Sequence, residues 1–372
     1  MRVLVLTGDG IGPEVMAQGL RVLQVASQYA GIAIEVVEAP IGKKPLFDEG
    51  TPFPSAAEAE LDRADAILFG ALGDPALDHL GPKRPDSAIG DLRRHLGLFA
   101  SFREIRITDT QADLSPLRKE RAEGTDIMIV REISGDVYAA QPKGQRMSPD
   151  GPFPGEPEGF DTMRYTESEV RRIARLGFRT AAERRGKLVS ADKSNVLETS
   201  RLWRRVVEET AREFPNVELV HQLADNVAMQ LVSEPRSFDT ILTANLFGDI
   251  LSDVASILTG SIGLPGSAMF NEAGKGLYEP GHGTALDIAG KDVANPISMI
   301  RCVALLLRYS GQRPDLADAI ECAIEQCLRE GLRTAEIHEP GTRLASTSEM
   351  GTAIAAKLDH ILAQDSRSST SN

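Results

Sequence analysis

Short apolar runs alternate with longer amphipathic stretches along most of the chain. The runs at 3–6, 66–70 and 127–130 are bounded by polar residues or glycine, which favours buried strands. Between the first two runs, apolar residues recur at helical spacing from Val15 to Ala26. Alternation of this kind predicts an α/β fold with a mostly parallel sheet. Further strands are expected at 32–37, 188–190, 217–222 and 241–243.

Length, charge and cysteine content narrow the class of protein. A chain of 372 residues is too long for one simple core and suggests two lobes. The net charge of −13 argues against a nucleic-acid partner and against binding to an anionic membrane. No apolar run approaches the roughly 20 residues of a membrane helix, and the N-terminus does not resemble a signal peptide. Three cysteines without zinc-type spacing also favour a cytoplasmic protein.

Two segments depart from the alternating pattern. The segment at about 141–163 is rich in glycine, proline and polar side chains. A loop of this length inside a compact protein is usually functional or forms an arm between subunits. After about residue 362 the chain ends in a polar sequence, Ser-Arg-Ser-Ser-Thr-Ser-Asn, so we expect a disordered tail.

Residues 238–253 carry the strongest chemical signal. The apolar run 240–243 predicts a strand, and a helix is expected to begin near Asp249-Ile-Leu-Ser-Asp253. The spacing of i and i+4 places both carboxylates on one helix face, where they repel each other unless a cation lies between them. Hard oxygen ligands suit Mg²⁺ or Mn²⁺. A solvated acidic face near a helix N-terminus is the alternative that the residues alone leave open.

Seven short motifs follow one another in an order that is found in a known family. They are Gly-Asp-Gly-Ile-Gly-Pro-Glu at 8–14, Leu92-Arg93 with Phe102-Arg103, Val130-Arg131-Glu132 with Tyr138, Asp-Lys-Ser-Asn-Val-Leu at 192–197, Asp225-Asn226, Asn-Leu-Phe-Gly-Asp at 245–249, and the run from Glu279 to Lys291. From about residue 2 to about residue 360 the chain resembles the isocitrate/isopropylmalate dehydrogenase family of β-decarboxylating dehydrogenases. It is most similar to the isopropylmalate members.

The resemblance implies a two-lobed fold that differs from the Rossmann topology. Residues 1–98 plus 260–372 would form a cofactor-binding lobe, and residues 99–259 a substrate, metal and dimerisation lobe. The active site would lie in the cleft between the lobes of an obligate homodimer, and each site would be shared between the two subunits. The arm at 141–163 would then be an intersubunit clasp.

The implied reaction oxidises the hydroxyl of a 3-substituted malate, passes hydride to NAD⁺ and releases CO₂. By default the substrate would be (2R,3S)-3-isopropylmalate, which is converted to 2-oxo-4-methylpentanoate in leucine biosynthesis. Arg93, Arg103 and Arg131 match the family's ligands for the substrate carboxylates, a role that suits planar, permanently charged donors.

The resemblance also assigns the metal ligands and the proton carriers. Asp249 and Asp253 would bind Mg²⁺ or Mn²⁺ together with Asp225 of the partner chain. The partner chain would also supply Lys193, which removes the hydroxyl proton, and Tyr138 would protonate C3 of the enolate. From the residues alone, Lys193 could be a solvated lysine and Tyr138 a tyrosine that satisfies one hydrogen bond.

NAD⁺ is favoured over NADP⁺ on a physical argument. In the family, the residue that Asp287 matches accepts hydrogen bonds from the adenosine ribose, and a carboxylate there repels a 2′-phosphate. The other implied cofactor-binding residues are Glu279, His282, Gly283, Ile288 and Asn295.

The chain departs from the family pattern where the third substituent of the malate is recognised. Gly90 follows Ile89 at a position where leucine is usual, although glycine inside a helix costs about 0.5–1 kcal/mol relative to alanine. Ala139 replaces a usual phenylalanine. Both truncations could admit a benzyl or long alkyl group in a specialised pathway, or they could be compensated drift in an ordinary enzyme. Val196 is a further implied substrate contact.

A non-catalytic regulatory or binding subunit is the hypothesis from a different functional class. The presence of Lys193, Tyr138 and the three aspartates argues against it, because the loss of catalysis normally removes such residues first.

Overall fold

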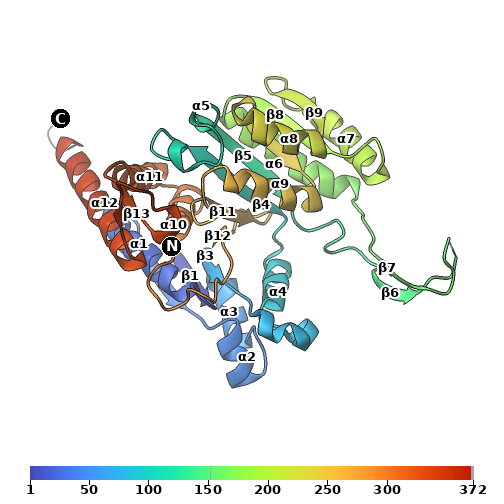
Figure 1. The fold of residues 1–372 in the computed structure, drawn as a ribbon, viewed down its shortest axis with the longest axis horizontal. Coiled ribbons are helices and arrows are strands. Elements are labelled where there is room, and N and C mark those ends of the chain that lie inside the picture. The colour runs from blue at the N-terminus through green and yellow to red at the C-terminus, as the bar shows by residue number, and fades with distance from the viewer. Residues whose placement is uncertain (151, 370–372) are drawn as a thin grey trace. The chain divides into compact units, whose positions relative to one another are not determined.

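The chain forms two compact units in the computed structural model, which describes residues 1–150 and 152–369 (Figure 1). Unit 1 comprises Met1–Leu98, Arg103–Thr125 and Ser256–Asn372, and unit 2 comprises Phe99–Phe102 and Asp126–Ala255. Residues 103–125 and 256–259 therefore belong to unit 1, whereas the sequence prediction placed them in the other lobe. The assignment of cofactor binding to one lobe and of substrate and metal binding to the other stays a prediction.

Five strands of unit 1 lie side by side in the order β2-β1-β3-β12-β11. The pairs β1–β2, β1–β3 and β3–β12 are parallel, and β11–β12 is antiparallel. All six residues of β3 are buried, because helices cover both of its faces, whereas the edge strand β2 is mostly exposed. The strands are β1 (Arg2–Gly8), β2 (Glu35–Glu38), β3 (Ala66–Ala71), β11 (Gly266–Phe270) and β12 (Gly276–Pro280).

Four long helices gather on one side of these strands (Figure 1). They are α1 (Gly12–Tyr29), α10 (Ile297–Tyr309), α11 (Pro314–Arg329) and α12 (Thr347–Ser369). Helices α1 and α10 approach each other closely at Gly19, where a Cβ atom would lie only 2.8 Å from Cγ of Met299. The remaining elements with residues in unit 1 are α2 (Lys43–Glu49), α3 (Ser55–Arg63), α4 (Ser87–Leu96), β4 (Ala100–Ile107), α5 (Lys119–Ala122), β13 (Leu332–Arg333), β14 (Arg343–Leu344) and the 3₁₀ turns Pro75–Lys83, Ala112–Leu114 and Ala335–Ile337.

The C-terminal tail differs from the prediction. Helix α12 continues to Ser369, so residues 363–369 are helical rather than disordered. Leu358 and Leu362 are buried and anchor the helix, and the alanine and glutamine that follow are good helix formers. Residues 370–372 lie outside the described residues. None of the described helices is long and apolar enough to cross a membrane, and the cytoplasmic location stays a prediction.

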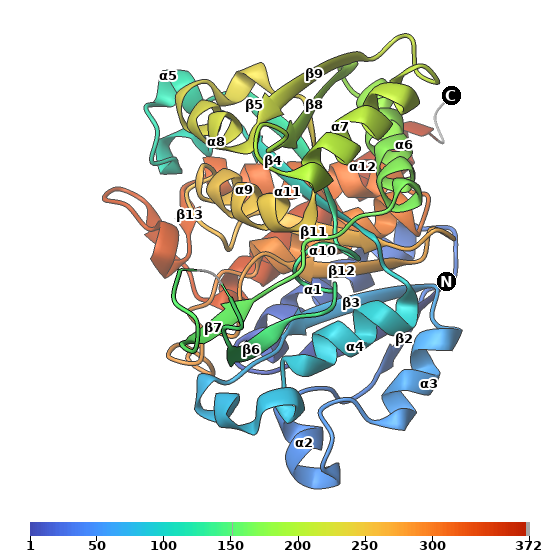
Figure 2. The ribbon, with the colours of Figure 1, turned by 90° about the vertical axis from the view of Figure 1, so that its right-hand side faces the viewer.

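Unit 2 is built on four parallel strands in the order β5-β10-β8-β9. Figure 2 shows α6 and α7 on one side of these strands and α8 and α9 on the other. Because the strands are parallel, their carboxyl ends meet at one edge, where Thr243 pairs with Arg131 and with Ala191. The elements are β5 (Thr125–Glu132), α6 (Glu167–Glu183), β8 (Lys187–Asp192), α7 (Glu198–Ala211), β9 (Glu218–Leu223), α8 (Ala224–Ser233), a 3₁₀ turn (Pro235–Ser237), β10 (Thr240–Thr243) and α9 (Asn245–Ile257).

The predicted arm contains an antiparallel hairpin that extends away from the rest of unit 2 (Figure 1). Its strands are β6 (Gly144–Met147) and β7 (Pro157–Phe160). Arg146 pairs with Glu158 and lies over the ring of Phe160, with its Cζ 4.7 Å from the ring centroid. Cross-strand contacts of this kind stabilise a short hairpin that composition alone predicts to be a loop.

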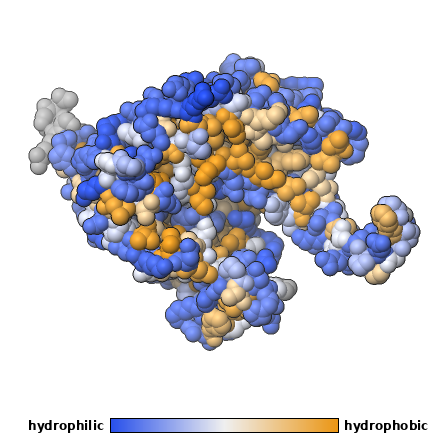
Figure 3. Space-filling model, in the orientation of Figure 1, coloured by the Kyte–Doolittle hydropathy of each residue, from blue (hydrophilic) through white to orange (hydrophobic). Residues whose placement is uncertain are grey.

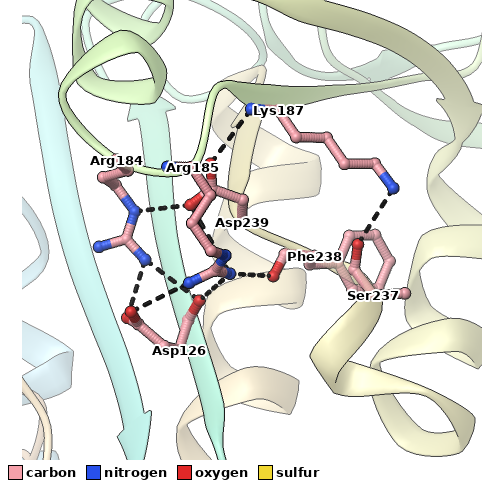
Figure 4. A network of polar contacts seen from close by, with 7 residues as sticks. All are labelled: Asp126, Arg184, Arg185, Lys187, Ser237, Phe238 and Asp239. Carbon is pink, nitrogen blue, oxygen red and sulfur yellow. Dashed lines mark hydrogen bonds and ion pairs between the residues drawn. The ribbon is translucent and has the colours of Figure 1, made fainter.

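The amino ends of the unit 2 strands are joined by charged side chains (Figure 4). Asp239, which is 2% exposed, accepts hydrogen bonds from Nε of Arg184 at 2.9 Å and from the backbone N–H groups of Arg185 and Lys187 at 3.0 and 3.2 Å. Both arginines also bind Asp126. This network fixes the connection between α6 and β8 at the edge of the strands opposite Arg131.

The variant Asp239→Ala is expected to lower the free energy of unfolding by about 3 kcal/mol, because it removes the acceptor of Nε of Arg184 and of the N–H groups of Arg185 and Lys187. Arg184 keeps its ion pair with Asp126 in this variant. The control Glu213→Ala removes the exposed partner of Arg175 and should cost less than about 1 kcal/mol. Urea denaturation measures both. Equal losses in the two variants would contradict a special role for the buried carboxylate.

Candidate active-site residues

Four side chains of unit 2 meet where β5 ends and α9 begins. Arg131 donates through Nε and Nη2 to Oδ1 of Asn245, at 3.1 and 2.7 Å, and through Nη1 to Asp249. The hydroxyl of Tyr138 donates to the other carboxylate oxygen of Asp249 at 2.7 Å. Gly248 permits this approach, because a Cβ atom there would lie 2.6 Å from Cγ of Arg131. The structure thus brings together Arg131, Tyr138 and Asp249, which the sequence singled out.

The environment of Tyr138 keeps its phenol protonated. Partial burial, together with the hydrogen bond to Asp249, raises the pKa of Tyr138 to about 12. The phenol is therefore protonated near neutral pH and acts as the donor in its hydrogen bond to Asp249.

Asp249 and Asp253 lie one turn apart on α9 and supply two hard oxygen donors. Among the residues that the structure describes, no three His, Cys, Asp or Glu side chains gather closely enough to hold a metal ion. A pair of carboxylates fits a divalent cation such as Mg²⁺, which keeps several coordination positions for water or substrate.

Lys193 and Asp225 form a second group in unit 2. The Nζ atom of Lys193 donates to Asp225 at 2.7 Å, and this hydrogen bond lowers the pKa of the Asp225 carboxyl. The backbone N–H of Lys193 donates to Oγ of Ser200 at 3.1 Å. Both charged side chains line a pocket of about 370 Å³ whose other walls are apolar. The apolar lining includes Val196, Leu246, Phe247, Ile250 and Leu251.

Arg93 and Arg103 belong to unit 1 and carry buried donors. Nη2 of Arg93 lies 3.6 Å from Oε2 of Glu279. Within the described part of the chain, Nε of Arg93 and both Nε and Nη1 of Arg103 are buried and have no hydrogen-bond partner. Gly281 leaves space for the guanidinium, since a Cβ atom there would lie 2.5 Å from Nη1 of Arg103. Buried donors of this kind suit an anionic ligand, because they cost free energy while they are unpaired.

The environment of Gly90 on α4 is open. A Cβ atom there would have one neighbour within 4 Å, Nη1 of Arg94 at 3.4 Å. Ile89 and Gly90 are both half-buried. An added side chain at residue 90 therefore meets no packed core, so the glycine is not required by packing within unit 1.

The segment that follows β12 is held by the first turn of α1. The backbone N–H of Ile11 donates to Thr284 O at 2.9 Å, and Glu14 accepts from the N–H groups of Gly290 and Asp292 at 3.1 and 3.3 Å. Asp287 is exposed within this segment, and Ile288 beside it is half-buried.

Two predicted cofactor contacts also have local partners. Nδ1 of His282 lies 2.9 Å from Gly283 O, and burial lowers the pKa of His282, which favours a neutral imidazole. Asn295 is buried, accepts from Ile297 N at 3.0 Å and donates to Glu336 at 2.9 Å. Asn295 therefore stabilises the start of α10 whether or not it binds a nucleotide.

Sequence reasoning did not assign a role to Asn245, although the residue stood inside a quoted motif. Its signal was an asparagine placed between a buried strand and a helix, a position from which its side chain can reach the neighbouring strand end. The bonds to Arg131 become visible only in the fold.

Comparisons with known proteins identify the family. The profile described as isocitrate/isopropylmalate dehydrogenase matches residues 2–354. A protein of Bordetella avium named 3-isopropylmalate dehydrogenase is 52% identical over 354 residues, which span 95% of this chain and 98% of the relative. A protein of the same name from Burkholderia thailandensis is 51% identical over 359 residues, which span 96% and 100%.

Solved structures agree with this family. The crystal structure of isocitrate dehydrogenase from Methylococcus capsulatus has a TM-score of 0.83 and 28% identity, and covers 96% of this chain and 99% of that chain. A β-decarboxylating dehydrogenase from Thermococcus kodakarensis has a TM-score of 0.78 and 33% identity, with 98% of each chain covered. The predicted fold class, family and enzyme class are confirmed. The chain belongs to the isocitrate/isopropylmalate dehydrogenase family and is a decarboxylating dehydrogenase.

Proposed function

We propose that the chain catalyses the NAD⁺- and divalent-metal-dependent oxidative decarboxylation of (2R,3S)-3-isopropylmalate to 2-oxo-4-methylpentanoate, a step of leucine biosynthesis. The observation that carries this proposal is the group formed by Arg131, Tyr138 and Asp249. It combines a guanidinium that can bind an anion, a protonated phenol and a carboxylate that can bind a metal ion. The names of the relatives that are 52% and 51% identical support the substrate. They do not favour a bulkier malate or a non-catalytic subunit.

In this proposal, the arginines bind the carboxylates of the substrate. Arg131 is held by Asn245 and Asp249, so its guanidinium is oriented before an anion binds. The buried, unpartnered donors of Arg93 and Arg103 give these residues the same chemistry in unit 1. Ile89, Gly90 and Val196 would contact the substituent of the malate.

Asp249 and Asp253, with Asp225 of the partner chain, would hold the divalent cation, which supplies Lewis acidity for the hydroxyl and for the enolate oxygen. The residues that would hold NAD⁺, which would supply the hydride acceptor for the oxidation, are Glu279, His282, Gly283, Asp287, Ile288 and Asn295. Lys193 of the partner chain would take the proton of the hydroxyl through its Nζ atom. Tyr138, which holds its proton near neutral pH, would protonate C3 once CO₂ has left.

The surface of unit 2 supports the proposal of a homodimer with shared active sites. Apolar residues gather over α8 and α9 in Figure 3. Val196, Met229 and Ile250 are 62%, 64% and 56% exposed, and Lys193 and Asp225 line the pocket that includes Val196 and Ile250. A contiguous apolar surface of this kind favours an interface between subunits, and a two-fold axis would carry Lys193 and Asp225 to the partner. The hairpin β6–β7 would be the clasp.

The substrate is tested by comparing kcat/KM for 3-isopropylmalate, 3-benzylmalate, isocitrate and malate with NAD⁺ and Mg²⁺. The proposal expects the highest value for 3-isopropylmalate and little change in the variant Gly90→Leu. A higher value for benzylmalate, lowered by Gly90→Leu, would favour the enlarged pocket instead. The absence of NADH formation with every acid would favour a non-catalytic subunit.

Removing the carboxylate of Asp287 is expected to weaken NAD⁺ binding and to relax discrimination against NADP⁺. Asp287→Ala should raise KM for NAD⁺ about tenfold, because hydrogen bonds to a charged group are worth about 1.5–3 kcal/mol each. The ratio of kcat/KM for the two cofactors should shift towards NADP⁺. Asp48→Ala, which removes a surface carboxylate of α2, is the control. Unchanged cofactor kinetics in Asp287→Ala would refute this role.

A further inference from the structure

Asn245 is the first residue of α9 and is 2% exposed. Its Oδ1 atom accepts two hydrogen bonds from one edge of Arg131, from Nε at 3.1 Å and from Nη2 at 2.7 Å. Its Nδ2 atom donates to Gly135 O at 3.0 Å. Two bonds from one edge of a planar guanidinium to a fixed oxygen set the plane of that group. Asn245 therefore determines the orientation of the Arg131 guanidinium.

Asn245 is itself held from behind by Tyr165. The backbone N–H of Asn245 donates to the hydroxyl oxygen of Tyr165 at 2.9 Å. The Tyr165 hydroxyl in turn hydrogen-bonds to the carboxylate of Glu132, and burial raises the pKa of Tyr165, so the hydroxyl keeps the proton that it donates. Gly135 leaves room for the ring, because a Cβ atom there would lie 2.6 Å from Cε1 of Tyr165.

Glu132 is the rigid end of this chain of bonds. Its side chain is fully buried and accepts from the backbone N–H groups of Ser134 and Gly135, both at 2.9 Å. Burial raises the pKa of the Glu132 carboxyl, and these hydrogen bonds oppose that rise. A buried polar network whose members are paired holds one arrangement firmly. Glu132, which follows Arg131 in the sequence, is thus linked to Asn245 by hydrogen bonds through Tyr165.

We propose that Asn245 and Tyr165 are positioning residues that fix the guanidinium plane of Arg131 and the first turn of α9, which Asp249 directly follows. Neither residue needs to touch the hydroxy acid. Their effect is to hold the donor and the metal-binding carboxylate in place before the substrate arrives, so that binding does not have to order them. The inference rests on the proposed role of Arg131 in binding the hydroxy acid.

Two variants of Asn245 distinguish the loss of the hydrogen-bond acceptor from the loss of side-chain volume. Asn245→Ala removes the acceptor, and KM for 3-isopropylmalate is expected to rise about tenfold to a hundredfold, the range that small misplacements of a binding group produce. Asn245→Asp keeps an oxygen acceptor for Arg131, but it loses the bond to Gly135 O and adds a buried negative charge, so it should recover part of the loss. KM for NAD⁺ should stay within about twofold in both, because Arg131 does not bind the cofactor.

Tyr165→Phe is the gentlest test, because it removes one oxygen atom and keeps the ring that packs edge-on against Trp203. We expect a rise of about tenfold in KM for 3-isopropylmalate, smaller than that of Asn245→Ala, because Asn245 keeps its own bonds to Arg131. Tyr29→Phe is the matched control, since it removes the hydroxyl that donates to Asp359 in unit 1. Thermal melting of every variant shows whether it is folded at the assay temperature.

The variant Arg131→Lys distinguishes a failure of this inference from a failure of the proposed function. If Arg131→Lys leaves KM for the acid unchanged, the substrate role of Arg131 is wrong and the inference falls with it. If Arg131→Lys raises KM while folded Asn245→Ala and Tyr165→Phe do not, the positioning role alone is refuted. A lower melting temperature with unchanged KM would likewise assign these residues a purely structural role. A rise in KM for the acid alone, partly recovered by Asn245→Asp, supports the inference.

Discussion

The variant Lys193→Met is expected to lower kcat by about 10²- to 10⁴-fold, the usual contribution of a positioned general base. Methionine keeps the length of the apolar stem and removes the amine. The amine lies 2.7 Å from Asp225, and the backbone of Lys193 is tied to Ser200, so the structure gives this lysine a defined position. KM for the hydroxy acid should change by less than about threefold, because the carboxylates are bound by arginines.

Lys187→Met is the matched control, since Lys187 lies on the same strand, β8. Its Nζ atom donates to Ser237 O at 3.3 Å, among the residues of Figure 4 at the amino end of the strand. Steady-state rates of NADH formation measure both variants. A Lys193→Met enzyme that keeps a tenth or more of kcat, about 1.4 kcal/mol or less in the barrier, would contradict the role of general base.

Asp249→Asn is expected to lower kcat about 10³-fold or more, because the metal contributes several kcal/mol of transition-state stabilisation. Asparagine has the same shape and still offers one oxygen to Arg131 or Tyr138, so the fold around α9 should persist. It lacks the negative charge that a divalent cation requires.

The metal role has a readout that does not depend on turnover. Titration of Mn²⁺ followed by electron paramagnetic resonance should show weaker binding in Asp249→Asn than in the unmodified enzyme. The control Glu208→Gln neutralises an exposed carboxylate of α7 and should leave Mn²⁺ binding as it was. Equal Mn²⁺ affinity in Asp249→Asn and the unmodified enzyme would remove Asp249 from the metal site.

Local patterns predicted the buried parallel strands well, because these are short apolar runs between polar turns. The runs at 3–6, 66–70 and 241–243 lie within β1, β3 and β10. The strands β11 and β12 were not predicted, although nearly all of their residues are buried. They contain glycine, serine and proline, which are weak strand formers. They pair with each other in an antiparallel register within the buried core of unit 1.

The grouping of the candidate site was only partly accessible from the sequence. Helical spacing alone places Asp249 beside Asp253, whereas Arg131 and Tyr138 joined them only through the resemblance to a family. Tyr165 and Asn245 are 80 residues apart, and their hydrogen bond depends on how α9 follows β10 at the edge of the strands. No local pattern encodes such a bond, because the positions of both partners are set by the packing of unit 2.

The most direct test of the shared active site is the activity of hybrid dimers made from Lys193→Met and Asp249→Asn chains. Each variant alone should be nearly inactive. In a hybrid dimer, one site would combine the intact Lys193 of one chain with the intact Asp249 of the other. A random mixture should therefore regain about a quarter of the unmodified activity, and a doubly tagged, purified hybrid about half. A purified hybrid as inactive as its parents would show that Lys193 and Asp249 do not act together across two chains.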